Sequence, residues 1–157
     1  MADAVLPEDC DWRIRRLYDY WRSVHPASGG LPGRQHIDPA AFPELLPWLW
    51  LVDVERQPLR FRYRLVGTEQ VQAMDADLTG RYLDEAHPVF PTSVTYPQYV
   101  AAAERGEVGY YRGPPAFHIT KKHVAIERVL LPLARDAHQV DILLALTVYR
   151  RASAASG

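Results

Sequence analysis

The segment that decides the fold runs from Leu49 to Gly80 and has the sequence LWLVDVERQPLRFRYRLVGTEQVQAMDADLTG. Two runs rich in β-branched and aromatic residues, Pro47–Val54 and Leu59–Val66, flank a polar connector with a proline at a turn position, which is typical of an antiparallel hairpin. Gly67 ends the second run, and Thr68 is expected to cap the short helix that follows. A hairpin that leads directly into short helices leaves a space between sheet and helices, where we expect the functional site.

The second run of the hairpin alternates between two kinds of side chain, as expected for a strand. One face contains the apolar side chains of Phe61, Tyr63 and Leu65. The other contains Arg60, Arg62 and Arg64. One face is therefore expected to be buried and the other to form ion pairs.

The register of the first strand decides which of its side chains face inward. We expect Trp50 to lie opposite Tyr63 and Val52 to lie opposite Phe61. A slip of one residue would exchange the two faces of the strand. The first register is favoured because it leaves Asp53 on the arginine face, where it can pair.

The segment Pro7–His25 has the spacing of an amphipathic helix and ends at Pro26. Its apolar stripe can pack on its own domain or on a second copy of the protein. We take the stripe as a candidate homodimer surface, made by Ile14, Leu17, Tyr18 and Trp21. A further helix start is predicted at Asp38, as N-cap, followed by Pro39.

The rest of the chain predicts two helices and three strands. The helices are expected at Arg81–Ala86 and Ser93–Arg105, and the strands at Val108–Gly113, Lys122–Leu133 and Val140–Arg150. This order predicts an α+β fold, an antiparallel five-stranded sheet with helices inserted after the second strand and covering one sheet face. We divide the chain into an N-terminal helical lead-in (residues 1–46), a domain (47–150) and a disordered tail (151–157).

Composition excludes several classes of function. The 157 residues have a net charge of -1 and scattered basic residues, which argues against nucleic acid as a partner. No apolar run reaches the roughly 18–20 residues that a membrane helix needs, so no membrane is expected to be bound. One cysteine, Cys10, permits no intrachain disulfide and indicates a reducing cytoplasm.

Several spaced motifs resemble one family. They are LPGRQHIDP, LLPWLWLVDVE, FRYRLVGT, DLTGRYLDE and VLLPLARDAHQVDILLAL. Together with the element order, they make the region from Trp12 to Tyr149 similar to PAS sensory domains, in a bacterial subfamily of small, often stand-alone proteins. The resemblance implies a cavity between sheet and helices that holds a small ligand or cofactor, and a protein that senses, dimerises or relays a signal.

No feature assigns a metal or cofactor. His118 and His123 are five residues apart on a predicted strand and would point to opposite faces, so neither they nor His87 predict a metal site; we expect surface histidines. No histidine lies on the predicted helix Ser93–Arg105, where a haem ligand would be needed. Cys10 lies in the lead-in, which excludes covalent flavin photochemistry; non-covalent flavin stays open. The cofactor is unknown.

Catalytic groups are also sparse. Glu127, within VAIERVLL, is the one carboxylate inside an apolar run, and it could be buried or paired with an arginine. An alternative function, a small α+β barrel enzyme of the isomerase or dehydratase type, would need Glu127 or His118 to face its cavity. Such barrels place long helices before most of the sheet, which disfavours this alternative.

The remaining candidates are apolar and aromatic side chains expected around the space between sheet and helices. They are Trp50, Phe61, Tyr63, Met74, Tyr82, Tyr99 and Phe117. Such a lining suits an apolar or aromatic ligand, although these side chains could equally fill the core of a ligand-free interaction scaffold.

We therefore expect a cytoplasmic sensory module and no enzyme. A ligand would favour one packing of helices and sheet, and the lead-in helix would report it. No kinase, cyclase or DNA-binding segment follows, so we expect the output to act in trans, on an unidentified protein partner or on a second copy.

Overall fold

The computed structural model describes residues 5–117 and 124–151 of the chain. Within these ranges five strands form one antiparallel sheet in the order β2-β1-β5-β4-β3. The strands are β1 Leu49–Glu55, β2 Arg60–Val66, β3 Gly109–Gly113, β4 Val124–Leu133 and β5 Ile142–Arg151. The α-helices are α1 Trp12–Ser23, α2 Thr68–Met74, α3 Leu83–Ala86 and α4 Tyr96–Arg105. The predicted α+β fold, with helices inserted after the second strand, is confirmed.

Short 3₁₀ helices complete the connections. They are η2 Arg34–His36, η3 Pro39–Ala41, η4 Pro43–Trp48 and η5 Phe90–Thr92. Asp38 caps η3 as predicted, because its side chain accepts a hydrogen bond from the Ala40 amide at 3.0 Å. Thr68 is instead the first residue of α2, and Gly67 occupies the N-cap position. No helix in the described ranges is both long and apolar enough to cross a membrane.

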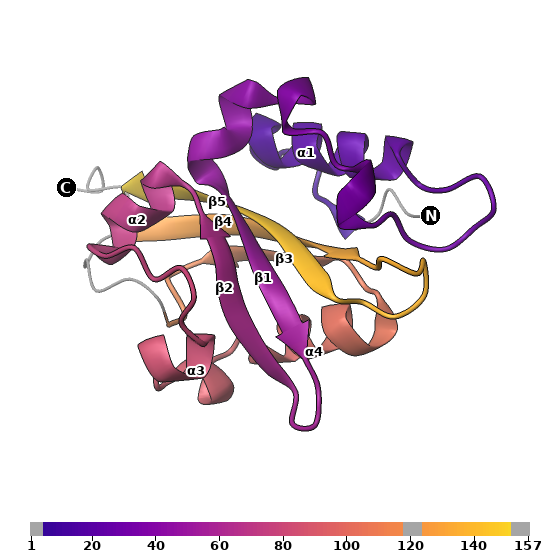
Figure 1. The fold of residues 1–157 in the computed structure, drawn as a ribbon. Helices are drawn as coiled ribbons and strands as arrows, with labels where there is room; N and C mark the ends of the chain where they lie inside the picture. The colour runs from indigo at the N-terminus through magenta and orange to yellow at the C-terminus, as the bar shows by residue number, and fades with distance from the viewer. Residues whose placement is uncertain (1–4, 118–123, 152–157) are drawn as a thin grey trace.

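Helices cover both faces of the sheet, and not one face as predicted. Helix α1 and the 3₁₀ segments η2, η3 and η4 lie on one face, and α2, α3, η5 and α4 lie on the other (Figure 1). The lead-in face buries side chains such as Ile14, Leu17, Leu51, Leu131, Leu133 and Leu144. The opposite face buries Trp50, Val52, Phe61, Tyr63, Tyr99 and Leu143. A sheet buried on both sides explains why the first seven residues of β5, ILLALTV, are apolar except for the buried Thr147 and do not alternate with polar residues.

The hairpin register is two residues away from the one expected. Tyr63 pairs with Val52 and Phe61 with Val54, while Trp50 lies opposite Val66. Trp50, Val52, Phe61 and Tyr63 nevertheless lie on the expected face, since a two-residue shift preserves side-chain direction. Asp53 lies within 4 Å of two β2 arginines, as the register argument required.

Leu65 was assigned to the wrong face. The pairing shifts between Leu51 and Val52, which marks a β-bulge in β2 with Arg64 as the extra residue. The extra residue turns Leu65 to the lead-in side, where it pairs with Leu51 and is 44% exposed.

Helix α1 packs on its own sheet. It begins at Trp12, later than expected, because Asp11 is its N-cap and accepts a hydrogen bond from the Arg13 amide at 2.9 Å. The four residues proposed as a dimer surface are buried against the sheet: Ile14, Leu17, Tyr18 and Trp21. The indole of Trp21 also donates a hydrogen bond to the Pro132 carbonyl at 3.0 Å. This stripe is not available to a second copy while α1 stays docked, which corrects the prediction.

Predictions for residues 118–123 and for the tail 152–157 lie outside the described residues. They concern His118, His123 and the tail for which disorder is expected from the sequence.

Candidate functional site

Six aromatic rings meet on the sheet face that α2, α3 and α4 cover. We call this group the aromatic cluster; it consists of Trp50, Phe61, Tyr63, Phe90, Tyr99 and Phe117. The ring centroids of Phe90 lie 4.7 Å from Phe117 and 5.0 Å from Tyr99, in tilted and edge-on contacts. Trp50 lies at the other end of the cluster, with its ring centroid 5.7 Å from that of Tyr63. Such geometry is the favourable one for aromatic pairs.

Most of the side chains predicted to line the site belong to this cluster or pack against it. Trp50, Phe61, Tyr63 and Tyr99 are buried, and Met74 and Phe117 are partly buried against them. Phe90 belongs to the cluster too, but sequence reasoning missed it because it lies in a proline-flanked 3₁₀ turn without periodicity.

Tyr82 does not line the cluster. Its hydroxyl donates a hydrogen bond to Glu55 at 2.7 Å, and its ring lies 3.6 Å from the guanidinium carbon of Arg60. It instead forms an isolated bridge with Arg62, next to the edge of the sheet. Its role is to cover the arginine face of β2, which corrects the prediction.

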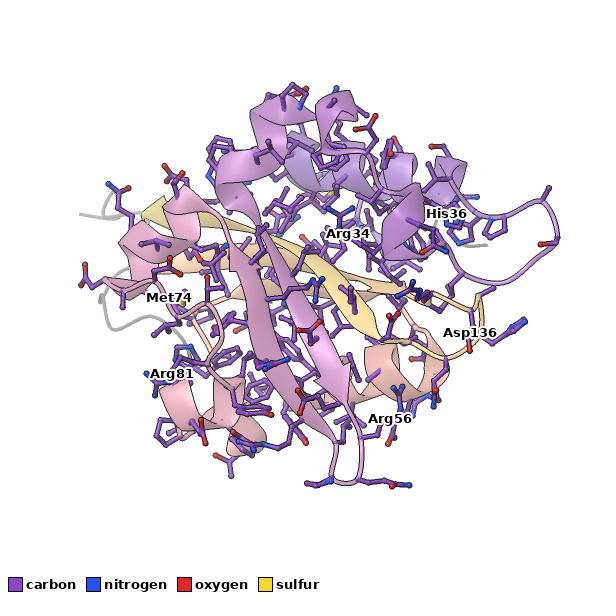
Figure 2. All side chains as sticks on the ribbon, in the orientation of Figure 1. Arg34, His36, Arg56, Met74, Arg81 and Asp136 are labelled. Atoms are coloured by element: carbon purple, nitrogen blue, oxygen red, sulfur yellow. The ribbon has the colours of Figure 1, made fainter. Side chains whose placement is uncertain are left out.

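The cluster contains a buried hydroxyl–imidazole pair. The Tyr63 hydroxyl lies 2.8 Å from His87 Nε2 and 3.6 Å from the sulfur of Met74. In Figure 2, Met74 and Arg81 lie near α2 and α3. Burial lowers the pKa of His87 to about 4, with a smaller contribution from the Arg81 charge, and burial raises the pKa of Tyr63 well above its usual value. Both groups are therefore neutral at pH 7. His87 is only 8% exposed and is not the surface histidine expected from the sequence.

Arg128 is a buried cation beside the cluster. It projects from β4 and is 2% exposed, with its guanidinium carbon 5.1 Å from the Tyr99 ring centroid. One guanidinium nitrogen, Nη2, donates a hydrogen bond to Gln98 Oε1 at 2.8 Å. The other, Nη1, is buried and has no hydrogen-bond partner among the described residues. Burial lowers the pKa of Arg128, and Tyr99 partly offsets this effect.

The contacts of Arg128 do not balance its charge. No described carboxylate forms an ion pair with it at 4.0 Å or less. Stacking on an aromatic face stabilises a cation by about 0.5–2 kcal/mol, whereas burying an unpaired charge costs several kcal/mol. Sequence reasoning missed this residue because it assumed one covered sheet face; a strand buried on both faces buries every side chain along it.

A sequence model of the PAS domain family matches residues 12–148. The match spans every helical segment from α1 to α4 and the sheet as far as Val148. The chain belongs to the PAS domain family. This match confirms the resemblance seen in the sequence. PAS domains are sensory and signalling modules. Neither the search of curated proteins nor the search of solved structures found a match.

In this PAS domain, the carboxylate singled out from the sequence lies on the lead-in face. Glu127 is 1% exposed and accepts hydrogen bonds from the Asp11 amide at 2.8 Å and the Tyr110 hydroxyl at 2.7 Å. Arg150 donates a third at 3.1 Å, so the side chain is both buried and paired with an arginine. Glu127 thus attaches the start of α1 to the sheet, on the face opposite the aromatic cluster.

The pKa of His87 predicts a pH dependence of stability for this PAS domain. Because the folded-state pKa, about 4, lies below the usual 6.5, the unfolded chain binds the proton more tightly. Stability is then lost as the pH falls from 7 to 4, by up to about 3 kcal/mol from this group.

The variant His87→Gln keeps a hydrogen-bonding partner for Tyr63 but does not titrate in this range. Urea unfolding at pH 7 and pH 4.5 should show a smaller loss for His87→Gln than for the parent protein, while the exposed-site control His138→Gln should lose as much as the parent. Equal losses in all three proteins would contradict the buried neutral imidazole.

Proposed function

We propose that this PAS domain binds a small apolar or aromatic molecule in the aromatic cluster and reports it through the lead-in. The observation that supports this most is the position of two adjacent residues of β4. Glu127 holds the N-terminus of α1 on one sheet face, and Arg128 borders the cluster on the other. A change in the packing of the cluster that moves β4 therefore changes the attachment of α1.

The mechanism is a shift between two packings of one chain. The rings of the cluster contact one another, so a ligand that enters must displace some of these contacts and favour a different arrangement of α4 and the sheet. Helix α4 is joined to β4 by the Gln98–Arg128 hydrogen bond and to β3 by a bond from Gln98 to the Tyr110 carbonyl. Tyr110 in turn donates to Glu127. These bonds form a continuous path from the cluster to the lead-in.

Signalling in place of catalysis is supported by the position of Glu127. A general acid or base must reach a substrate, whereas this carboxylate is enclosed by three donors on the lead-in face. The output partner would be a protein or a second copy of the chain that contacts the lead-in when α1 loosens. Such a dimer would use a surface other than the buried stripe of α1. The single cysteine favours the cytoplasm as the compartment.

Hydrogen exchange tests the coupling between the two faces. The protein as purified is compared with protein that has been unfolded in guanidinium, freed of small molecules and refolded. We expect exchange of the α1 amides to differ by about tenfold between the two, which corresponds to about 1.4 kcal/mol of local stability. The turn between β1 and β2 is the internal control and should not change. Identical α1 exchange after removal of a bound molecule would contradict the proposal.

A further inference from the structure

Arg128 differs from the other buried charge of β4 in having an unsatisfied donor. Glu127 is matched by three hydrogen-bond donors, including an arginine. Arg128, one residue along the chain, has one neutral acceptor, Gln98, and a buried Nη1 with none among the described residues. Buried charges in proteins are almost always paired, so this guanidinium has the environment of a binding group whose anion is supplied from outside the chain.

The surroundings of Nη1 indicate what kind of anion fits. Gly109 places no side chain beside it: a methyl group built on Gly109 would lie 3.5 Å from Nη1, and 3.3 and 3.4 Å from the side chains of Leu130 and Gln98. The rings of Tyr99 and Tyr111 lie 5.1 and 6.0 Å from the guanidinium carbon. An acceptor at Nη1 is therefore flanked by aromatic surfaces, and Tyr99 continues into the aromatic cluster.

We propose that Arg128 binds the carboxylate of a small organic anion whose aromatic or apolar body lies against Tyr99 in the cluster. This inference rests on the proposed ligand-binding function and names the chemical class of the ligand. The carboxylate accepts a hydrogen bond from Nη1 and neutralises the buried charge, while the rings exclude water from the pair. A neutral molecule of the same shape leaves the charge unpaired and binds more weakly.

Thermal unfolding with benzoate and with its neutral counterpart benzamide tests the class of ligand. At about ten times its dissociation constant, benzoate should raise the unfolding midpoint by about 3–5 °C, and benzamide should raise it less. Sodium chloride and inorganic phosphate at equal ionic strength serve as controls, and neither should reproduce the shift. A shift with phosphate as large as that with benzoate would show that Arg128 binds inorganic oxyanions, and would overturn the inference that its ligand is an organic carboxylate.

Substitution of Arg128 separates a ligand-binding arginine from a structural one. Arg128→Met keeps most of the volume without the charge; we expect the midpoint without ligand to stay the same or rise and the benzoate shift to disappear. Arg128→Lys keeps a cation and should retain part of the shift. Arg105→Met, at an arginine that is exposed at the end of α4, is the matched control and should retain all of it.

The outcomes distinguish this inference from the proposed function. Equal shifts with benzoate and benzamide that survive in Arg128→Met would overturn the inference that Arg128 binds an anion, and would leave ligand binding by the cluster intact. A benzoate shift present in Arg105→Met and absent in Arg128→Met supports the inference. No shift with benzoate, together with no anion released from the purified protein on denaturation, overturns it; a neutral molecule released in that experiment would still support the proposed function.

Discussion

Replacing Leu17 by aspartate is expected to lower the thermal unfolding midpoint by about 10–20 °C. Leu17 is fully buried between α1 and the sheet. Removing its side chain creates a cavity, and the carboxylate must lose its hydration or force α1 off the sheet, for a total cost of about 5 kcal/mol. For a domain of this size, each kcal/mol corresponds to about 2–4 °C.

The control for this variant is Trp12→Asp, at a residue of the same helix that is 58% exposed. Its midpoint should change by no more than about 2 °C, since surface substitutions rarely exceed about 0.5 kcal/mol. Calorimetry and light scattering on both variants provide the measurement. A Leu17→Asp protein that kept the parent midpoint but changed from dimer to monomer would show that the stripe is an exposed dimer surface after all, and that α1 is not docked as described.

Replacing Glu127 by alanine is expected to cost about 3–5 kcal/mol and to release the lead-in. The substitution removes the shared acceptor of the Asp11 amide, the Tyr110 hydroxyl and Arg150, and leaves buried donors unsatisfied. Glu127→Gln keeps an acceptor oxygen and should cost about half as much. Urea unfolding gives the energies, and hydrogen exchange of α1 shows whether the loss is centred on the lead-in.

Glu44→Ala is the matched control for Glu127→Ala. Glu44 also forms an ion pair with an arginine, Arg16 at 2.8 Å, but both side chains are 42% exposed. Exposed pairs contribute about 0–1 kcal/mol, so this variant should unfold close to the parent. Equal effects of the two substitutions would contradict the role of Glu127 as the attachment point of α1.

The element order and most of the aromatic lining could be predicted from the sequence, because both depend on local patterns. Alternation in β2 set Phe61 and Tyr63 on one face, and turn residues marked the strand ends. The hairpin register could not be predicted, since the bulge at Arg64 depends on how β2 pairs with β1 and not on the sequence pattern of β2. The same bulge explains why Leu65 lies on the unexpected face.

Two further errors have one physical source, the treatment of the sheet as covered on one side. The stripe of α1 was left open between packing on its own domain and packing on a second copy, and the second was taken as the candidate dimer surface. Because both faces are covered, the stripe packs on the sheet of its own domain. The sequence left the burial of Glu127 open, whereas the burial of the adjacent Arg128 on the opposite face follows only from a sheet that is covered on both sides.

The central claim is that the aromatic cluster holds a small molecule, and mass spectrometry of the purified protein tests it most directly. Under native conditions we expect a mass above that of the chain, or above a whole multiple of it, by one small molecule per chain, and under denaturing conditions the loss of that molecule. A native mass equal to the chain or its multiple, unchanged after incubation with the small-molecule fraction of a cell extract, would contradict ligand binding and leave the cluster as a filled core.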